Sequence, residues 1–431
     1  MAANKPGKAE ILAAFFDDGT YSPLFTDGAV SAAYGCANGQ NAYVVFEDGS
    51  PVGVQDIEKN IRVLEMAAET GAPVVTFYDS TGAKLEGGLA LLNANARLTA
   101  EIARVSGVVP QIAVVTGTCA GTNAINAASA DVCVMAEDAE LFLNAPFNAE
   151  DKVANAGSAA FAAKAGVAAV TAADAVAAAK QAASIVALLP ANNLAGPALF
   201  DFAAPSKALD LVKYTAADAV AALADEGSAV ELYAGYGKNI VTALATINGS
   251  AVGIVATEKK ALCHKCTAKA ARFVRLCDAY SIPVVTIVNT EGFGRSEGDD
   301  EAGGIRQAPV WPVSMPRPRL SRSLFWPVRL SAPPTPSLPP ALTGALPCRA
   351  APWLRWPLRL PSRSCTRTRS LLLTTSSTPP RPRLLPTPRR SAAPMPLLQT
   401  ALPTPLRCCH RPRKRCSGTG YAGRQACCAS G

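Results

Sequence analysis

The sequence has 431 residues, of which 49% are hydrophobic, and a formal net charge of +8. This length and hydrophobic content are enough for two or three domains with a sizeable core. It has no cationic start followed by an apolar core and a cleavage site, and no uninterrupted apolar run of about 18 residues. We therefore expect no signal peptide, no membrane span, a cytoplasmic location and reduced cysteines.

The charge divides the chain near residue 307. Residues 1–307 hold 21 Lys and Arg against 33 Asp and Glu, whereas residues 308–431 hold 20 Lys and Arg and no acidic residue. The second part also carries 24 of the 34 prolines, and proline disrupts both helical and sheet hydrogen bonding. We expect residues 308–431 to form a disordered Pro/Arg-rich tail.

Two hypotheses explain this tail. A basic arm would bind nucleic acid, with its tryptophans stacking on bases. Alternatively, the reading frame has shifted, because Ala codons in a GC-rich gene become Pro, Arg, Leu, Gln and His codons when read one base late. We favour the frame shift, which would turn an Ala-rich domain into this composition, and we expect no nucleic-acid partner.

The first elements of the chain alternate between helix and strand. Asn38-Gly39 is a hairpin turn signal because both residues tolerate a positive φ, and Gly71 suits the end of a helix. The predicted elements are a helix over Lys8–Phe16, strands over Val30–Tyr34 and Tyr43–Phe46, a helix over Val54–Thr70, a buried strand over Pro73–Tyr78 and a helix from about Gly88 to Val105.

The stretch from Val108 to Ala130 combines a strand, a turn of small residues and an Ala-rich helix. The strand covers Gln111–Thr116, and the turn runs from Gly117 to Gly121. The first N–H groups of a helix have no partner within it, so they suit a phosphate or an oxyanion. The turn is equally compatible with a role in packing the helix on the sheet.

Later elements repeat this alternation. The pattern predicts strands over Asp131–Met135 and Glu140–Leu143, a helical stretch over Gly157–Ala187, a helix over Ala216–Ala224, strands over Val241–Ile247 and Val252–Ala256, a helix over Ala268–Tyr280 and a strand over Pro283–Val288.

Several motifs recur 210 residues apart, which indicates an internal duplication. Pro73–Thr76 recurs as Pro283–Thr286, and the turn Asn38-Gly39 recurs as Asn248-Gly249. The second copy of the Gly117–Gly121 turn should lie near residues 320–333, a region that resembles neither a buried strand nor a Gly-rich turn. We therefore expect the second copy to be truncated.

The order of motifs resembles the carboxyltransferase subunits of biotin-dependent acyl-CoA carboxylases and decarboxylases, which belong to the crotonase superfamily. The resembling motifs are Ser80–Gly87, Val109–Ile112, Cys119–Gly121, Ala165–Ala168, Leu189–Asn193, Lys269–Arg275, Ile282-Pro283 and Gly292-Phe293. The resemblance implies an α/β fold of tandem crotonase-like spiral domains. We predict an N-terminal domain over residues 1–200 and a truncated C-terminal domain over residues 201–307.

The resemblance also implies the chemistry. A carboxyl group would pass between carboxybiotin and a short-chain acyl-CoA of the propionyl-CoA or methylmalonyl-CoA type, with the thioester enolate held by backbone N–H groups. Gly121 and Thr122 would supply catalytic N–H groups of the first half, although the family usually has a second Gly at the position of Thr122. The implied substrate-binding residues are Gly82, Ala83, Gly117, Ala120, Gly292 and Phe293.

The implied partners follow from the missing biotin attachment site. No Met-Lys-Met motif is present, so biotin would arrive on a biotin carboxyl carrier protein, with biotin carboxylase or decarboxylase subunits in the same complex and a homo-oligomer of this chain. Without the second turn, carboxyl transfer should fail in the chain as written. The direction of the reaction stays open.

Two alternatives remain. A crotonase-type acyl-CoA hydratase or isomerase would need an acidic residue beside Gly121, and no such residue is evident in the sequence. The second alternative is an inactive binding subunit, or a nucleic-acid-binding protein that acts through the tail. We also considered Cys263-His264-Lys265-Cys266 as a zinc site, but no second Cys pair stands at the required spacing, and we predict no metal.

Overall fold

A computed structural model describes residues 6–148, 150, 153–201, 203–205, 214–294, 296–311 and 324–327. The chain divides into two units, Met1–Arg349 and Ala350–Gly431, and every described residue lies in the first. None of the helices in those ranges is long and apolar enough to cross a membrane. The predicted tail therefore lies largely outside the described residues.

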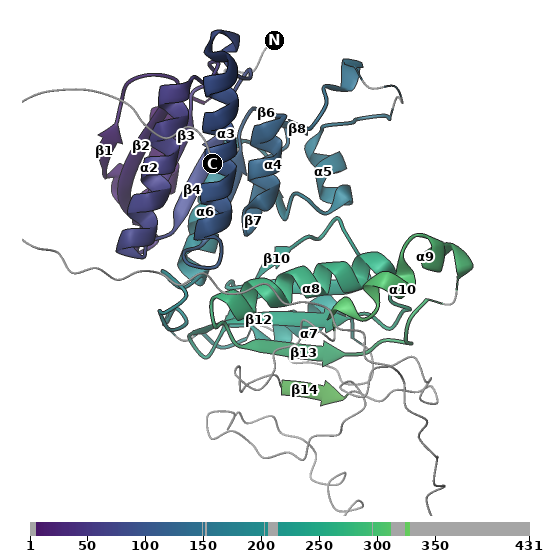
Figure 1. Cartoon of the computed structure of the whole chain (residues 1–431). Helices are drawn as coiled ribbons and strands as arrows, with labels where there is room; N and C mark the ends of the chain where they lie inside the picture. Colours follow the sequence, from purple (N-terminus) through teal and green to yellow (C-terminus); the bar gives the residue numbers. More distant parts are fainter. Residues whose placement is uncertain are drawn as a thin grey trace, which may run out of the picture. The chain divides into compact units, whose positions relative to one another are not determined.

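The first half of the chain builds a seven-stranded sheet (Figure 1). The first three strands pair antiparallel and the remaining pairs are parallel. In spatial order the strands are β1 (Tyr21–Phe25), β2 (Val30–Ala37), β3 (Gln40–Glu47), β4 (Val74–Tyr78), β5 (Gln111–Val115), β7 (Val132–Ala136) and β9 (Val170–Ala172).

The helices of this half belong to two separate hydrophobic clusters. Apolar residues of α1 and α6 join one cluster, and those of α2 and α3 join the other. The helices are α1 (Lys8–Phe15), α2 (Val54–Thr70), α3 (Gly88–Val105), α4 (Thr122–Ser129), α5 (Ala159–Ala165) and α6 (Ala175–Leu188), with short 3-10 turns at Asp17–Gly19, Leu85–Gly87 and Pro146–Asn148. Two further strands, β6 (Thr118–Ala120) and β8 (Glu140–Phe142), form a small parallel pair.

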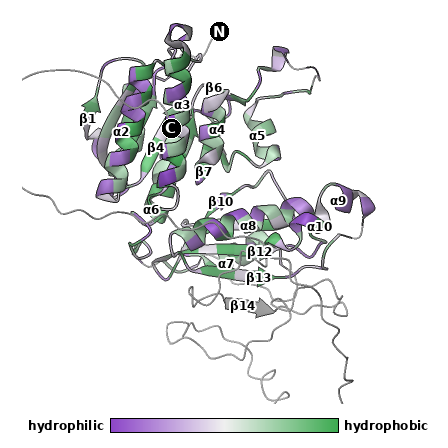
Figure 2. Ribbon diagram, viewed as in Figure 1, coloured by the Kyte–Doolittle hydropathy of each residue, from purple (hydrophilic) through white to green (hydrophobic). Residues whose placement is uncertain are grey.

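The second half builds a five-stranded sheet in the order β10 (Val230–Leu232), β11 (Ile240–Ile247), β12 (Ser250–Thr257), β13 (Val284–Val288) and β14 (Leu324–Pro327). Its helices are α7 (Ala216–Leu223), α8 (His264–Ala279), α9 (Glu297–Glu301) and α10 (Gly304–Gln307). Strands β12 and β13 are largely hydrophobic, whereas α9 is hydrophilic (Figure 2).

The duplication is visible in the hydrogen bonding. Strands β3 and β4 start their parallel pairing with a bond from the Tyr43 N–H to the Pro73 carbonyl, at 2.8 Å. Strands β12 and β13 start theirs with a bond of the same length from Gly253 to Pro283, each residue 210 positions later. We call the first half of the chain, with its seven-stranded sheet, the first repeat, and the second half, with its five-stranded sheet, the second repeat. The duplication predicted from the sequence is thus confirmed.

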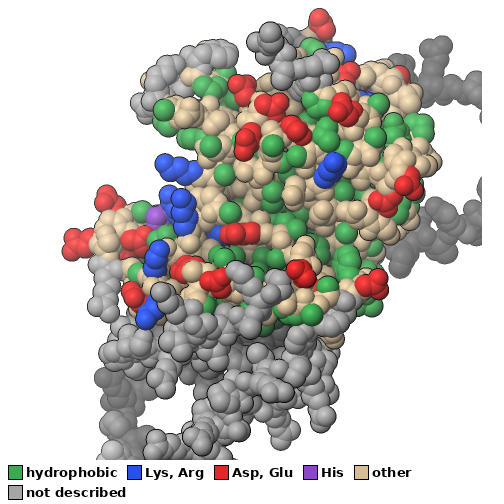
Figure 3. All heavy atoms as spheres, turned by 180° about the vertical axis from the view of Figure 1, so that it is seen from behind, with side chains coloured by type: hydrophobic (Ala, Val, Ile, Leu, Met, Phe, Trp, Pro, Cys, Tyr) green, Lys and Arg blue, Asp and Glu red, His purple; other side chains and the backbone are tan. Residues whose placement is uncertain are grey.

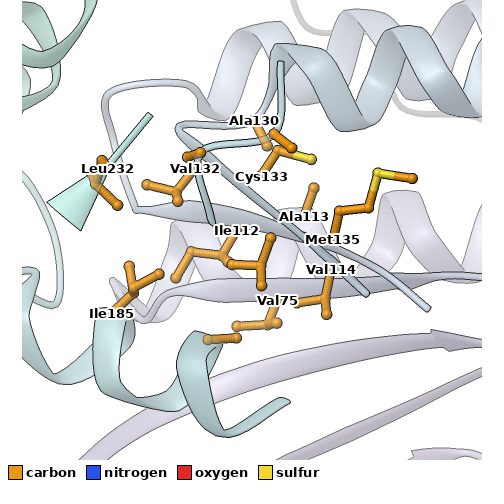
Figure 4. Close-up of a cluster of buried hydrophobic side chains, with 14 of the residues drawn as sticks. Val75, Ile112, Ala113, Val114, Ala130, Val132, Cys133, Met135, Ile185 and Leu232 are labelled. Carbon is orange, nitrogen blue, oxygen red and sulfur yellow. The ribbon is translucent and has the colours of Figure 1, made fainter. Parts of the chain in front are cut away.

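One hydrophobic cluster includes residues of both repeats. Figure 4 shows Ile112 and Val132 of the first sheet with Ile185 of α6 and Leu232 of β10. Tyr280, which follows α8, is buried and its hydroxyl donates to the Asp131 carboxylate at 2.6 Å. Burying apolar surface contributes about 25 cal/mol per Å², so this shared cluster favours folding of both repeats together.

Several predictions were wrong in detail. The helical stretch predicted over Gly157–Ala187 is two helices separated by β9, because Gly166 ends α5 in the left-handed conformation. The short strands β1, β6 and β10 were not predicted. The folded part also extends beyond residue 307, since Trp311 is 1% exposed and β14 pairs in parallel with β13. A strand therefore occupies part of the 320–333 region where none was expected.

Candidate active site

Two chain segments lie side by side where β4 and β5 end. The first is Asp79–Ala83 and the second is Thr118–Thr122, and we call them the donor segments. The Ser80 N–H donates to the Thr118 carbonyl at 2.9 Å, and the Thr118 N–H donates to the Asp79 carboxylate at 3.1 Å. These bonds join the segment that contains Gly82 and Ala83 to the segment that contains Gly121 and Thr122.

Both donor segments contain a glycine with a positive φ. Gly82 has φ of 122° and Gly121 has φ of 58°, a region that other L-residues rarely adopt. A Cβ atom placed on either glycine would meet no other atom within 4 Å. Open space therefore lies in front of both segments, and a bound group can approach their backbone.

Gly121 does not offer a free N–H group. Its N–H donates to the Phe142 carbonyl at 3.1 Å and extends the pairing of β6 with β8. This corrects the prediction that Gly121 is an oxyanion donor. Helix α4 starts at the next residue, and its first internal bond runs from Ile125 to the Gly121 carbonyl. The N–H of exposed Thr122 thus has no backbone acceptor within the described ranges.

A second free donor lies at Ala83. The Val52 N–H donates to the Gly82 carbonyl at 2.8 Å, and the Lys84 N–H donates to the Val52 carbonyl at 2.9 Å. This parallel bridge leaves the intervening N–H of Ala83, an exposed residue, without a backbone acceptor among the residues described. The donor segments therefore present one N–H each, from Ala83 and from Thr122.

Two other predicted residues support the second donor segment. The Gly117 carbonyl accepts the Glu140 N–H at 3.0 Å, and Ala120 lies in β6 opposite Phe142. Their backbone groups hold the segment against β8.

A buried carboxyl group, which the sequence analysis missed, joins the donor segments. Glu47 is 3% exposed at the end of β3, and both of its oxygens lie 3.1 Å from the Asn123 side-chain amide. One oxygen also accepts the Asp79 N–H at 3.2 Å. Burial raises the pKa of Glu47 from 4.5 to about 8, against the lowering effect of the bonds from Asp79 and Asn123.

Glu47 is thus an acidic residue that contacts Asn123, two residues after Gly121, and the sequence analysis did not identify it. Asn123 is the second residue of α4, so the carboxyl group links the start of this helix to the loop after β4. Its burial keeps it out of the open space, however, so it is placed to position the donor segments rather than to touch a substrate. The signal available in the sequence was an acidic residue at the end of a strand in a parallel sheet, the edge at which ligands bind.

The predicted residues of the second repeat lie in an equivalent loop. The Gly292 carbonyl accepts the Leu262 N–H at 2.8 Å, and the Leu262 carbonyl accepts the Gly294 N–H at 2.9 Å. Gly292 is buried, and the partly buried Phe293 between the two glycines packs against the core. The residues that would follow β14 as a second glycine turn lie outside the described residues.

Two charged side chains of the resembling motif Lys269–Arg275 have structural contacts. Lys269 donates to the Ile240 carbonyl at 2.8 Å, and burial lowers its pKa to about 8. Arg272 donates to the Ala128 and Ala130 carbonyls at the end of α4, at 3.2 and 3.3 Å. These side chains fasten α8 to its surroundings.

The described side chains also bear on the metal and nucleic-acid alternatives. In the described ranges, no group of three or more His, Cys, Asp or Glu side chains is placed to hold a metal ion. Acidic and basic side chains are interspersed on the face drawn in Figure 3. The basic stretch that would bind nucleic acid lies almost wholly outside the described residues.

Comparison with known proteins identifies one matching family model. The model, described as the carboxyl transferase domain, matches residues 7–308. The match ends one residue past the change in composition at residue 307.

Curated relatives point the same way. The methylmalonyl-CoA carboxyltransferase 12S subunit of Propionibacterium freudenreichii subsp. shermanii is 32% identical over 305 residues, which are 65% of this chain and 58% of that protein. The propionyl-CoA carboxylase beta chain of Cereibacter sphaeroides is 30% identical over 307 residues, 65% of this chain and 60% of that protein. The chain thus spans less than two thirds of the length of these relatives.

A solved structure matches as well. The transcarboxylase 12S crystal structure, a hexamer assembly with hydrolysed methylmalonyl-CoA bound, has a TM-score of 0.66 and 27% identity over 72% of this chain and 70% of that one. The crotonase-like α/β fold implied by the resemblance is thereby confirmed.

Proposed function

Because the chain belongs to the carboxyl transferase domain family, we propose that it is a biotin-dependent carboxyltransferase subunit. It moves a carboxyl group between carboxybiotin and a short-chain acyl-CoA of the propionyl-CoA or methylmalonyl-CoA type. The observation that carries this proposal is the pair of N–H groups, from Ala83 and Thr122, that have no backbone acceptor among the described residues and lie beside the open space at Gly82 and Gly121.

The backbone supplies the chemistry of the first repeat. Removing a carboxyl group from methylmalonyl-CoA leaves negative charge on the thioester oxygen. Preorganised N–H donors stabilise such charge, and removing one donor from an oxyanion hole typically costs about 100- to 1,000-fold in rate. Ala83 and Thr122 are the donors proposed here, and Glu47 keeps them in register through Asp79 and Asn123.

The acyl-CoA would lie along the donor segments, where Gly82 and Gly121 leave room for the thioester to approach the backbone. Biotin, delivered by a carrier protein, supplies the carboxyl acceptor or donor, and it would approach the Gly292-Phe293 loop. A biotin carboxyl carrier protein, biotin carboxylase or decarboxylase subunits and further copies of this chain are the proposed partners. The domain limit at residue 200 remains part of the same proposal.

A transfer assay tests the function. A frame-restored chain, in which the second glycine turn is intact, is mixed with methylmalonyl-CoA and a biotinylated carrier domain, and carboxylation of the carrier is followed by mass spectrometry. Binding of propionyl-CoA is titrated separately on that chain and on the full chain as written. We expect one propionyl-CoA site per chain. Carboxyl transfer by the frame-restored chain would support the proposal. If that chain binds propionyl-CoA but transfers no carboxyl group, either to biotin or from carboxybiotin, the proposal is refuted.

A further inference from the structure

Two cysteines stand together at the start of α8, in the second half of the chain. Cys263 is the residue before the helix and Cys266 is its third residue, and their sulfur atoms are 3.2 Å apart. Cys266 is fully buried, whereas Cys263 is partly exposed. The pair therefore has one accessible sulfur and one sheltered sulfur.

The first repeat has a different pair at the same place. Gly53 and Asp56 lie 210 residues earlier, and the Asp56 carboxylate accepts the Gly53 N–H at 3.0 Å. This is a helix-capping arrangement, which stabilises the helix by satisfying a free N–H group. The second repeat has replaced the capping carboxylate with a thiol and the glycine with a second thiol. Capping alone does not account for the replacement, since thiols are weak acceptors.

The surroundings favour a thiolate on Cys263. The hydrogen bond with the Cys266 sulfur lowers the pKa of Cys263 to about 5, and the backbone N–H groups of Cys266 and Lys265 also lower it, against the raising effects of burial and of the Asp299 carboxylate. The same hydrogen bond, together with burial, raises the pKa of Cys266. A thiolate at a helix start in a Cys-x-x-Cys motif is the reactive form in thiol–disulfide exchange.

The neighbouring histidine does not complete a metal site with these sulfurs. His264 Nδ1 lies 2.7 Å from the Asp299 carboxylate, and its backbone N–H faces the same oxygen at 3.4 Å. The imidazole is thus engaged with α9. Among the described residues the two sulfurs have each other as their close sulfur partner, and this favours a dithiol over a metal ligand pair.

We propose that Cys263 and Cys266 form a redox-active dithiol that exchanges with low-molecular-weight disulfides. The Cys263 thiolate attacks one sulfur of a small disulfide R–S–S–R, forms a mixed disulfide and expels one thiolate, which takes up a proton. Cys266 then loses its proton, attacks the Cys263 sulfur and expels the second thiolate. Two protein thiols are oxidised to one disulfide, and the small disulfide is reduced to two thiols.

The cysteine pair lies next to the backbone bonds that hold the Gly292-Phe293 loop. Cys263 follows Leu262, whose backbone holds Gly292 and Gly294. Disulfide formation would shorten the sulfur separation from 3.2 Å to about 2.05 Å. The reaction therefore acts one residue from the ladder that fixes the Gly292-Phe293 loop, and it stands independently of carboxyl transfer.

The first test measures thiol reactivity. The reduced full chain is alkylated with iodoacetamide at pH 6 and pH 8, and each cysteine is followed by peptide mass spectrometry. The rate at Cys263 should change less than about threefold, because its pKa is already below this range. Cys36, also partly exposed, should slow by about 100-fold, since the pKa of its thiol is raised by burial and by Asp17.

The second test follows exchange with glutathione disulfide. The unmodified chain should form an internal Cys263–Cys266 disulfide, Cys266→Ser should keep a mixed disulfide on Cys263, and Cys263→Ser should form neither. Cys277→Ser, which removes a buried thiol elsewhere in α8, should behave like the unmodified chain. A Cys263 whose pH profile matches that of Cys36 would overturn the proposal, even if the serine variants failed to fold. A mixed disulfide with glutathione that persists on Cys263 of the unmodified chain would also overturn it.

Discussion

The two repeats share a backbone and differ in the side chains that hold it. In both, a hydroxyl group accepts the N–H of the glycine two residues later, from Ser80 in the first repeat and from Thr290 in the second, each at 3.1 Å. By contrast Glu47 is replaced by Thr257 at the equivalent position. Backbone donors can thus be duplicated by repeating the fold, while side-chain properties diverge.

The side chains at equivalent positions of the two repeats carry different chemical groups. Glu47 accepts the Asp79 N–H at 3.2 Å, and the Thr257 hydroxyl accepts the Asn289 N–H at 2.6 Å. The first repeat therefore carries an ionisable group where the second carries a neutral one. The capping carboxylate of Asp56 is likewise replaced by the Cys266 thiol. The first repeat depends on buried carboxyl groups, and the second on hydroxyl and sulfur groups.

The largest effect expected concerns the end of the second repeat. If a frame shift begins near residue 307, the chain as written should not transfer a carboxyl group, and a frame-restored chain should. Sequencing the coding DNA across codons 300–320 checks this first. One alternative frame should encode a strand followed by a Gly-Gly or Gly-Ala turn near residues 320–333. If both alternative frames lack them, or if the chain as written catalyses transfer, the frame-shift hypothesis is wrong.

The next effect concerns a single donor of the first repeat. Thr122→Pro removes the proposed N–H group, while proline is well accepted at the first position of a helix. We expect kcat for carboxyl transfer in the frame-restored chain to fall about 100- to 1,000-fold. The matched variant Thr122→Ala keeps the N–H group and should retain transfer within about threefold. Equal activity of the two variants would remove Thr122 from the proposed site.

The pH dependence of stability separates the repeats at Glu47 and Thr257. Because the folded pKa of Glu47 is raised to about 8, the folded chain keeps a proton that the unfolded chain loses above its ordinary pKa of 4.5. Stability should therefore fall as pH rises from about 4.5 to 8, by up to about 1.4 kcal/mol per pH unit from this group.

Urea unfolding at pH 5, 6, 7 and 8 measures this dependence. Glu47→Gln should flatten the fall, whereas Thr257→Val changes the equivalent site without removing a titrating group and should follow the unmodified chain. Parallel curves for all three proteins would contradict the assigned pKa of Glu47.

The smallest effect should be equal in the two repeats. Ser80→Ala and Thr290→Val each remove the hydroxyl that holds a loop glycine. Each should destabilise the chain by about 1–3 kcal/mol, which is the typical cost of leaving a buried donor without its bond. A difference in unfolding free energy well above about 0.5 kcal/mol between the two variants would show that the loops are not held equivalently.

Local signals explain which elements could be predicted. The helix Val54–Thr70 was predicted with its observed limits, because its apolar spacing is regular and Gly71 ends it with a left-handed turn. The turn at Asn38-Gly39 was equally clear. Strand β9 was hidden because a three-residue strand within an Ala-rich stretch carries almost no periodic signal.

The sequence motifs point to two segments but do not predict the hydrogen bonds that these segments make. The motifs located Gly82, Ala83, Gly121 and Thr122, and the structure brings the two segments together. The engagement of the Gly121 N–H depends on β6 pairing with β8, a non-local contact that no local pattern encodes. The bond between Glu47 and Asn123 spans 76 residues and was missed for the same reason.

The central claim is that the N–H groups of Ala83 and Thr122 hold the thioester oxygen of an acyl-CoA. A crystal structure of the full chain with a non-reactive propionyl-CoA analogue measures this directly. We expect that oxygen to lie within about 2.7–3.1 Å of both nitrogens, with the Gly121 N–H still bound to the Phe142 carbonyl. A thioester bound elsewhere, or an oxygen held by Gly121 after its bond to Phe142 has broken, would contradict it.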